Sequence, residues 1–264
     1  MSGIPGQPYL PTFLAAGSPE ARTLVLLHGI GSTALGWHAQ LQAFPGRRVL
    51  AWNAPGYGDS MPLPSTQPVA QDYALALLKL LNSQDLGSIA LVASSWGTPI
   101  AIALAALHPA RITHLVLSGP TAGYGALPPA QRSALLAARG ERARTAGISA
   151  MLEQDAPRLL ATDLPAERRQ QHVLARQGVT LEGYLQALHA LAAANAPRAL
   201  RDVVCPTLIV YGEQDAIAPP AEHALRLAEA LPSAQLHAFP RCGHLPHVEL
   251  PERFNHLVEA FIDS

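Results

Sequence analysis

The fold of this chain is decided by the stretch Leu91-Val92-Ala93-Ser94-Ser95-Trp96-Gly97-Thr98. An apolar run typical of a buried strand, Ile89 to Ala93, leads directly into Ser95, and a helical pattern follows from Pro99 to Leu107. A sharp strand-to-helix turn of this kind exposes the serine hydroxyl and brings backbone N–H groups at the start of the helix beside it. The turn needs small neighbours, because the strand and helix backbones nearly touch there, and Ala93 and Gly97 meet that need.

Strand and helix patterns alternate on both sides of this turn. Further apolar runs predict strands over 23–27, 48–52, 112–117, 207–211 and 235–239, and glycine or proline follows each of them closely. Helical spacing of apolar residues is found over 69–81, 221–231 and 252–262. Strands that are apolar throughout and alternate with helices are typical of a parallel sheet covered on both faces. The sequence therefore predicts an α/β fold.

The pattern changes between residues 121 and 200, where strand signals disappear. Helices are predicted there over 132–139, 148–160, 166–176 and 181–194, and prolines and Gly178 separate them. We expect residues 1–120 and 201–264 to form the core and residues 121–200 to form a helical cap, or lid, over a site. A helical bundle with no role in access to the site is the alternative.

Composition and charge exclude several classes of protein. The 264 residues are 49% hydrophobic, which is enough for one large core. A formal net charge of −1 without a basic run argues against a nucleic acid or an anionic membrane as partner.

The uncharged segment 86–110 is long enough to span a membrane, but Ser94 to Pro99 interrupt it, so a buried strand, turn and helix are expected instead. No signal peptide is expected in Met1–Gly17, which favours a cytoplasmic location with reduced Cys205 and Cys242.

A serine hydroxyl is a weak nucleophile, and it needs a nearby base that an acid orients. In α/β sheets such groups gather at the carboxyl ends of the strands. Asp215 follows the strand at 207–211, and His244 follows the last strand at 235–239. The chain order Ser95, Asp215, His244 is the order typical of a strand-turn-helix nucleophile. We therefore predict Ser95 as nucleophile, His244 as base and Asp215 as the acid.

Each partner has a competitor in the sequence. Glu213 lies nearer the strand end than Asp215, and a capping role for Asp215 at the next helix is the structural alternative. His247 lies three residues after His244, a spacing that invites a metal site, but Pro246 between them keeps the two imidazoles off one helical face. No metal is expected, and His247 is interpreted as a surface or pocket residue.

The segment His28-Gly29-Ile30-Gly31-Ser32 is the second glycine-containing turn of interest. Its glycines allow a tight turn with an amide directed into the site, so the N–H groups of Ile30 and Trp96 are predicted to bind a developing oxyanion. His28 is then interpreted as a residue that stabilises the turn. The segment lacks the complete pattern of a phosphate-binding loop.

Taken together, the motifs resemble the α/β-hydrolase superfamily. They are His28-Gly29-Ile30-Gly31, Ala54-Pro55-Gly56-Tyr57-Gly58-Asp59-Ser60, Ser94-Ser95-Trp96-Gly97, Gly212-Glu213-Gln214-Asp215 and Gly243-His244. The resemblance implies an eight-stranded, mostly parallel sheet with an antiparallel strand near the N-terminus, a helical cap and no cofactor. Ala93 departs from the glycine that is usual before the nucleophile. Within the superfamily, the Ala54–Ser60 block and the small cap are most similar to the branch of 3-oxoadipate enol-lactonases and meta-cleavage-product hydrolases.

The sequence thus predicts a serine hydrolase that acts on a small-molecule substrate, a carboxylic ester or a lactone such as a 3-oxoadipate enol-lactone. Two alternative activities would use the same Ser95, His244 and Asp215 side chains. They are hydrolysis of a carbon–carbon bond in a meta-cleavage product and an aminopeptidase activity of the proline iminopeptidase type. A binding module that has kept the hydrolase fold is the non-enzymatic alternative. Arg158 and Arg176 are candidates to meet a substrate carboxylate, although solvated helix faces also explain them. The oligomeric state is left open.

Overall fold

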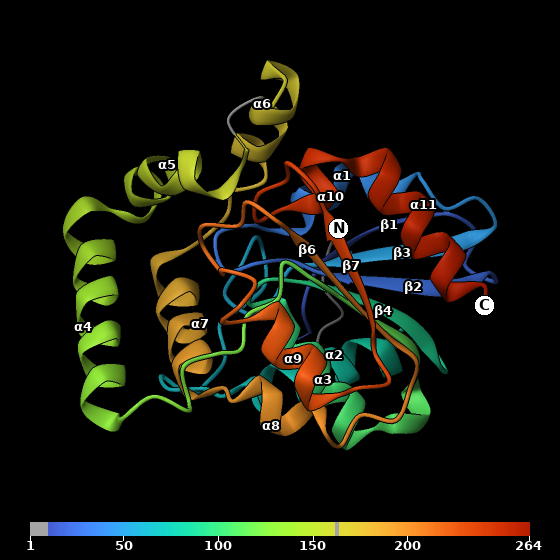
Figure 1. The fold of residues 1–264 in the computed structure, drawn as a ribbon, viewed down its shortest axis with the longest axis horizontal. Helices are drawn as coiled ribbons and strands as arrows, with labels where there is room; N and C mark the ends of the chain where they lie inside the picture. The colour runs from blue at the N-terminus through green and yellow to red at the C-terminus, as the bar shows by residue number, and fades with distance from the viewer. Residues whose placement is uncertain (1–9, 162–163) are drawn as a thin grey trace.

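The computed structural model describes residues 10–161 and 164–264. At its centre is a sheet with the strand order β1-β3-β2-β4-β5-β6-β7 (Figure 1). Neighbouring strands are parallel, except that β1 pairs antiparallel with β3. The strands are β1 (Phe13–Ala16), β2 (Arg22–Leu27), β3 (Arg47–Trp52), β4 (Ile89–Ser94), β5 (Ile112–Ser118), β6 (Thr207–Gly212) and β7 (Gln235–Phe239).

The strands form where the sequence has apolar runs. Strand β4 is buried along its whole length, and β2 is buried from Thr23 to Leu27. Such strands carry few polar residues because neither face of the sheet meets water. The α/β fold and the mostly parallel sheet are confirmed, and β1 is the antiparallel strand near the N-terminus. The described residues hold seven strands, against the eight that the resemblance implies, and residues 1–9 lie outside the described ranges.

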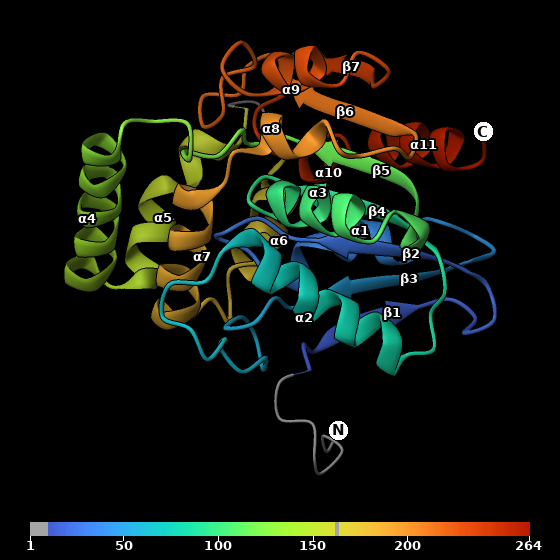
Figure 2. The ribbon, with the colours of Figure 1, turned by 90° about the horizontal axis from the view of Figure 1, so that it is seen from below.

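Helices cover both faces of the sheet (Figure 2). One face packs against α2 (Ala70–Ser83), α3 (Gly97–Leu107), α8 (Ala196–Leu200) and α9 (Ala224–Ala230). The other face packs against η1 (Ala34–Trp37), α1 (His38–Leu41) and α11 (Pro251–Ile262), next to the short α10 (Pro246–Glu249). Helix α11 shows the cause, since its buried residues Phe254, Val258, Phe261 and Ile262 recur at the spacing of one helical face.

A block of four helices is formed by the segment between β5 and α8. It consists of α4 (Pro129–Ala146), α5 (Ile148–Leu159), α6 (Ala166–Leu174) and α7 (Leu181–Ala193). The arrowheads of the parallel strands point toward α4, α5 and α7, which lie at the left of Figure 2. Helix α4 is longer than predicted: it begins with Pro129 in its first turn and stops at Gly147, whose φ of +78° ends a right-handed helix.

Hydrogen bonds join this block to the loop after β3. The Gly58 N–H donates to the carbonyl of Gly178 at 2.8 Å, and the Thr180 hydroxyl donates to the carbonyl of Gly56 at 2.7 Å. Gly56 itself has no room for a side chain, because a Cβ atom would lie 2.5 Å from Gly183 Cα. The Ala54–Ser60 block of the sequence is therefore a docking loop for α7.

The uncharged segment 86–110 forms β4, the turn at Ser95 and α3, as expected. Within residues 10–161 and 164–264, no helix combines the length and the apolar character that crossing a membrane requires.

Candidate active site

Ser95 lies at the turn between β4 and α3, and its backbone φ is +52°. A positive φ costs a residue with a side chain roughly 1–2 kcal/mol. Local hydrogen bonds hold the turn: the Ser95 N–H donates to the Ser118 carbonyl at 3.0 Å, and the Ser95 carbonyl accepts from the Thr98 amide at 2.9 Å and hydroxyl at 2.6 Å. The strained turn brings the serine side chain into the wall of a cavity.

Small residues make this turn possible. A Cβ atom at Gly97 would lie 3.0 Å from the carbonyl oxygens of both Leu27 and His28. A Cβ atom at Gly29 would lie 3.2 Å from Ser95 Cβ. The close backbone approach that the sequence predicts at Gly97 is therefore present. The end of β2 and the residues that follow it, Leu27 to Gly29, lie against the turn. Ala93, which stands in place of the usual glycine, is fully buried in β4.

Ser95, His244 and Asp215 lie in one chain of hydrogen bonds. His244 Nε2 is 2.8 Å from Ser95 Oγ, and His244 Nδ1 is 2.7 Å from Asp215 Oδ2. A carboxylate accepts the Nδ1 proton, so the neutral imidazole has Nε2 free to accept from the serine hydroxyl. His244 and Asp215 are both buried. The three residues come from loops that follow β4, β6 and β7.

The second carboxylate oxygen of Asp215 is engaged by the backbone of its own loop. Oδ1 accepts from the amides of Ile217 at 2.9 Å and Ala218 at 2.8 Å. These bonds fix the orientation of the carboxylate toward His244. Glu213, the competing acid, is exposed to solvent and makes no contact with the imidazole.

Glu249 of α10 holds the loop that carries His244, and sequence reasoning missed it. Its buried carboxylate accepts from the amides of Gly243 at 2.9 Å and Leu245 at 3.2 Å, one on each side of His244. It also accepts from the amide of Ala161 at 2.8 Å. The only signal in the sequence is an acidic residue among the apolar neighbours of 245–251, which predicts a buried acid but not its partners.

The amides of Ile30 and Trp96 flank the serine, and neither donates to another group in the described part of the chain. The peptide group that carries the Ile30 N–H is held from its other end. Its carbonyl, that of Gly29, accepts from His28 Nδ1 at 2.9 Å and from the Ser32 amide at 3.1 Å. Because the N–H and C=O of a peptide point in opposite directions, these bonds turn the Ile30 N–H away from them.

His28 is the residue that fixes this turn, in line with its interpretation from the sequence. Nδ1 donates to Gly29, and Nε2 accepts from the Ala54 amide at 3.0 Å. Burial lowers the pKa of His28 to about 4, and the hydrogen bond to Gly29 opposes that shift only in part. The imidazole is therefore neutral near pH 7, and both of its nitrogens are occupied.

Ser95 and His244 line a cavity of about 110 Å³. Its wall is largely apolar, with side chains from α5, α10 and the loops after β6 and β7, namely Leu152, Leu159, Ile217, Leu245 and Val248. Polar groups enter it from the helical block: Arg139, Asp155, His172 and Tyr184. The sequence did not single out Arg139 or Tyr184, because each lies on a helix whose pattern does not show which face meets the cavity.

His247 and His172 also line this cavity, and both are buried. The His247 ring stacks on Trp37 with 4.1 Å between centroids, and no hydrogen-bond partner of its Nδ1 is found in the described residues. Burial is the main cause that lowers the pKa of His247 to about 3, and burial together with Arg176 lowers that of His172 to about 3. In the described ranges, no three His, Cys, Asp or Glu side chains are grouped to hold a metal ion.

The two arginines that the sequence suggested for a substrate carboxylate are used differently. Arg158 is exposed on α5. Arg176 donates to the Leu152 carbonyl and to His172 Nε2, so it joins the segment after α6 to α5.

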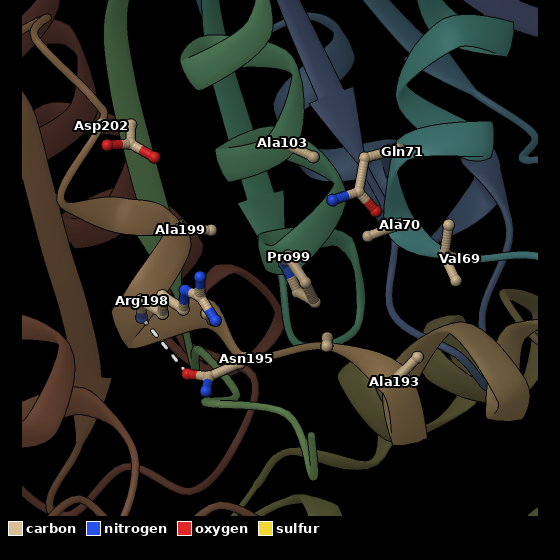
Figure 3. A pocket seen from close by; sticks show the side chains of 12 residues that line it. Val69, Ala70, Gln71, Pro99, Ala103, Ala193, Asn195, Arg198, Ala199 and Asp202 are labelled. Atoms are coloured by element: carbon tan, nitrogen blue, oxygen red, sulfur yellow. Dashed lines mark hydrogen bonds between the residues drawn. The ribbon is translucent and has the colours of Figure 1, made fainter. Parts of the chain in front are cut away.

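A separate hollow of about 320 Å³ lies between α2, α3, α7 and α8 (Figure 3). Apolar atoms of Val69, Pro99 and Ala103 form part of its wall, and Gln71 and Arg198 lie beside them. Ser95, Asp215 and His244 do not line it. The described residues that line this hollow include no serine or cysteine beside a histidine, so the smaller cavity is the candidate active site.

Comparisons with known proteins show the family and the fold of this chain. A family model described as alpha/beta hydrolase fold matches residues 22–251. The 2-hydroxy-6-oxononadienedioate/2-hydroxy-6-oxononatrienedioate hydrolase of Burkholderia vietnamiensis (strain G4 / LMG 22486) is 32% identical, over 90% of this chain and 86% of that protein. The enzyme of that name from Cupriavidus pinatubonensis (strain JMP 134 / LMG 1197) is 30% identical, over 92% of this chain and 88% of that protein.

Solved structures share the fold over nearly the whole chain. A thermophilic esterase from Thermogutta terrifontis, solved with malate bound, has a TM-score of 0.85 and 26% identity, covering 96% of this chain and 93% of the esterase. The enol-lactonase from Burkholderia xenovorans LB400 also has a TM-score of 0.85, with 24% identity and 96% coverage of both chains. At that identity, the likeness to the enol-lactonase shows the fold alone.

Proposed function

This chain belongs to the alpha/beta hydrolase fold family, and on that premise we propose that it is a serine hydrolase of a small carboxylic ester or lactone. One observation carries the proposal: Ser95 Oγ, His244 and Asp215 are linked by hydrogen bonds of 2.8 Å and 2.7 Å at the wall of a cavity. A hydroxyl on a base that an acid orients is the arrangement that activates serine for acyl transfer.

In the proposed mechanism, Ser95 attacks the substrate carbonyl while His244 Nε2 takes the hydroxyl proton. Asp215 keeps the imidazole in the required tautomer and stabilises its charged form. The amides of Ile30 and Trp96 donate to the carbonyl oxygen as it becomes negative. His244 then protonates the leaving group and activates a water molecule, which releases the acid and regenerates Ser95. No step needs a metal or an organic cofactor.

Residues 121–200 are proposed to act as a cap on a core made of residues 1–120 and 201–264. The support comes from the cavity wall, to which α4, α5, α6 and α7 each contribute a side chain: Arg139, Leu152, His172 and Tyr184. A cover of this kind excludes water from the acyl intermediate and supplies the contacts that select the substrate.

Hydrolysis of a carbon–carbon bond is a second candidate, because curated relatives at 30% and 32% identity carry the names of 2-hydroxy-6-oxononadienedioate hydrolases. The same serine would attack a ketone instead of an ester. A panel of aryl esters, enol-lactones, dienone acids and aminoacyl amides separates these activities. Turnover restricted to the dienone acids would replace the first candidate by the second.

Labelling with a fluorophosphonate tests the shared core of both candidates. The probe should modify Ser95, as mapped by peptide mass spectrometry, and a Ser95→Ala variant should remain unlabelled. Well-folded protein that binds small molecules but is neither labelled nor active would support a binding module instead.

A further inference from the structure

A small hollow lies behind the cavity that contains Ser95. It measures about 20 Å³ and lies between η1, α1, the end of α6 and α10. The residues that line both this hollow and the cavity are Gly36, His172, His247 and Val248. The rest of its wall is formed by Ala175 and by the exposed residues Leu35, His38 and Ala39. The small hollow therefore lies between the cavity and the protein surface.

Two buried imidazoles, those of His172 in α6 and His247 in α10, separate the two spaces. Arg176 donates to His172 Nε2, so the neutral His172 ring carries its proton on Nδ1. Within residues 10–161 and 164–264, no hydrogen-bond partner is found for His172 Nδ1 or for either ring nitrogen of His247. Buried polar atoms without a protein partner are commonly bonded to ordered water.

The size and the chemistry of the small hollow match one water molecule. A cavity needs about 10–15 Å³ to hold a water, so a space of about 20 Å³ holds one and has no room for an alcohol of several carbons. A neutral imidazole offers one donor and one acceptor. His172 and His247 can therefore both donate to a water and accept from it.

The attachment of the helical block favours a separate route for water. The His244 N–H donates to the Leu159 carbonyl at 2.9 Å, and Glu249 accepts from the amides of Gly243 and Ala161. Moving α5 away to admit a water would thus displace the base that must activate it. A path past His172 and His247 leaves these hydrogen bonds in place.

We propose that the water that hydrolyses the acyl-enzyme enters through the small hollow, where His172 and His247 act as positioning residues that hold it beside the cavity. This inference rests on the proposed function and names the route of its second substrate. In the step itself, the water oxygen bonds to the acyl carbon while His244 Nε2 takes a water proton. The bond from that carbon to Ser95 Oγ then breaks, and the proton passes from His244 to Oγ.

Competition between water and a larger alcohol tests the route. Enzyme supplied with p-nitrophenyl acetate and 1-butanol should form acetic acid with water and butyl acetate with butanol, which must enter by the route of the substrate. Gas chromatography gives the ratio of acid to ester. Ala39→Leu, which fills the hollow from its exposed side, and His247→Leu should each lower this ratio about 3- to 10-fold, the range for one lost hydrogen bond. His247→Gln keeps a donor and an acceptor, so it should recover part of the ratio.

Ala150→Leu is the matched control, because Ala150 is an exposed alanine of α5 that lines neither space. It should leave the ratio unchanged. A merely structural role for Ala39 and His247 would lower the formation of both products equally. An unchanged ratio in Ala39→Leu and His247→Leu therefore overturns the proposal.

A crystal structure of the native protein tests the water site without turnover. It should show an ordered water in the small hollow within hydrogen-bond distance of His172 or His247, and the Ala39→Leu protein should lack it. A dry hollow in the native protein overturns the inference, whatever the product ratios show. Failure of the proposed function has another signature, the absence of fluorophosphonate label on Ser95 in the native chain.

Discussion

The backbone N–H of His244 donates a hydrogen bond to the carbonyl oxygen of Leu159 at 2.9 Å. The proposed base is thereby joined to the end of α5, a helix of the block that covers the cavity. Glu249 adds a second connection, because its carboxylate accepts from Gly243 in the base loop and from Ala161 just after α5. Movement of this part of the helical block would therefore disturb the position of the imidazole.

Removal of the Glu249 carboxylate tests that connection. Glu249→Ala should lower the free energy of unfolding by about 3–5 kcal/mol, because two buried N–H groups and the partly buried N–H of Ala161 lose their acceptor. Glu249→Gln keeps one acceptor oxygen, so it should cost less and still lower kcat by displacing His244. Urea unfolding and ester turnover provide the two readouts.

Glu252→Gln is the control for Glu249, since its carboxylate is 77% exposed and pairs only with Arg168 in the described ranges. Its effect on unfolding should stay within about 0.5 kcal/mol. Equal losses for Glu249→Gln and Glu252→Gln would contradict the role assigned to Glu249.

Ser95→Ala should lower kcat by at least about a thousandfold, as expected for loss of the nucleophile. The positive φ of Ser95 supplies a second readout from the same position. Ser95→Gly should be more stable than Ser95→Ala by about 1 kcal/mol, because glycine adopts this conformation without a steric penalty. Thermal unfolding of the two inactive variants measures the difference, and equal stabilities would mean that the turn is not strained.

Asp215→Asn should lower kcat about ten-thousandfold near pH 7. The amide would present N–H donors to His244 Nδ1, and the imidazole would then carry its proton on Nε2, where it cannot accept from Ser95. Glu213→Gln removes a neighbouring exposed carboxylate and should retain the native rate. If Glu213→Gln instead caused the larger loss, the assignment of the acid would be wrong.

Three buried imidazoles make stability depend on pH. Burial lowers the pKa of His28 to about 4 and those of His172 and His247 to about 3, against 6.5 for an exposed imidazole. The folded state then binds fewer protons than the unfolded state between these values. The stability contribution is complete above pH 6.5 and is lost as the pH falls toward the folded pKa. At pH 5, the free energy of unfolding should be lower by about 2 kcal/mol for each of these histidines than it is above pH 6.5.

His247→Leu isolates one of these groups. The leucine replaces an imidazole that packs on Trp37 and whose Nδ1 has no hydrogen-bond partner in the described residues. The slope of unfolding free energy against pH between 5 and 6 should therefore decrease by nearly one proton. Urea unfolding across that range measures the slope, and an unchanged slope would show that His247 is not a buried neutral imidazole in the native state.

Much of the fold could be read from local patterns. The β4, turn and α3 unit follows from an apolar run, a serine between small residues and a helical repeat within 89–107. Strands β2 to β7 and the helices α4 to α7 likewise follow from periodicity, although α4 extends to Ala146, well beyond its predicted end at residue 139, because Gly147 stops it. The short helix α8 and strand β1 were not predicted from local patterns. The sequence also placed Ser95, Asp215 and His244 after three different strands, and the parallel sheet brings those strand ends to one edge.

Contacts between distant segments could not be read in this way. Glu249 meets Ala161 across 88 positions, and Arg139 meets Tyr184 across 45. A helical pattern shows which side chains are apolar, but an arginine on α4 or an acid on α10 carries no sign of the partner it will meet. The sequence by itself determined the elements and the order of the proposed reacting groups, because these depend on neighbours along the chain. Only the tertiary structure decided which side chains hold the base and which charge enters the cavity, because these depend on how helices pack on the sheet.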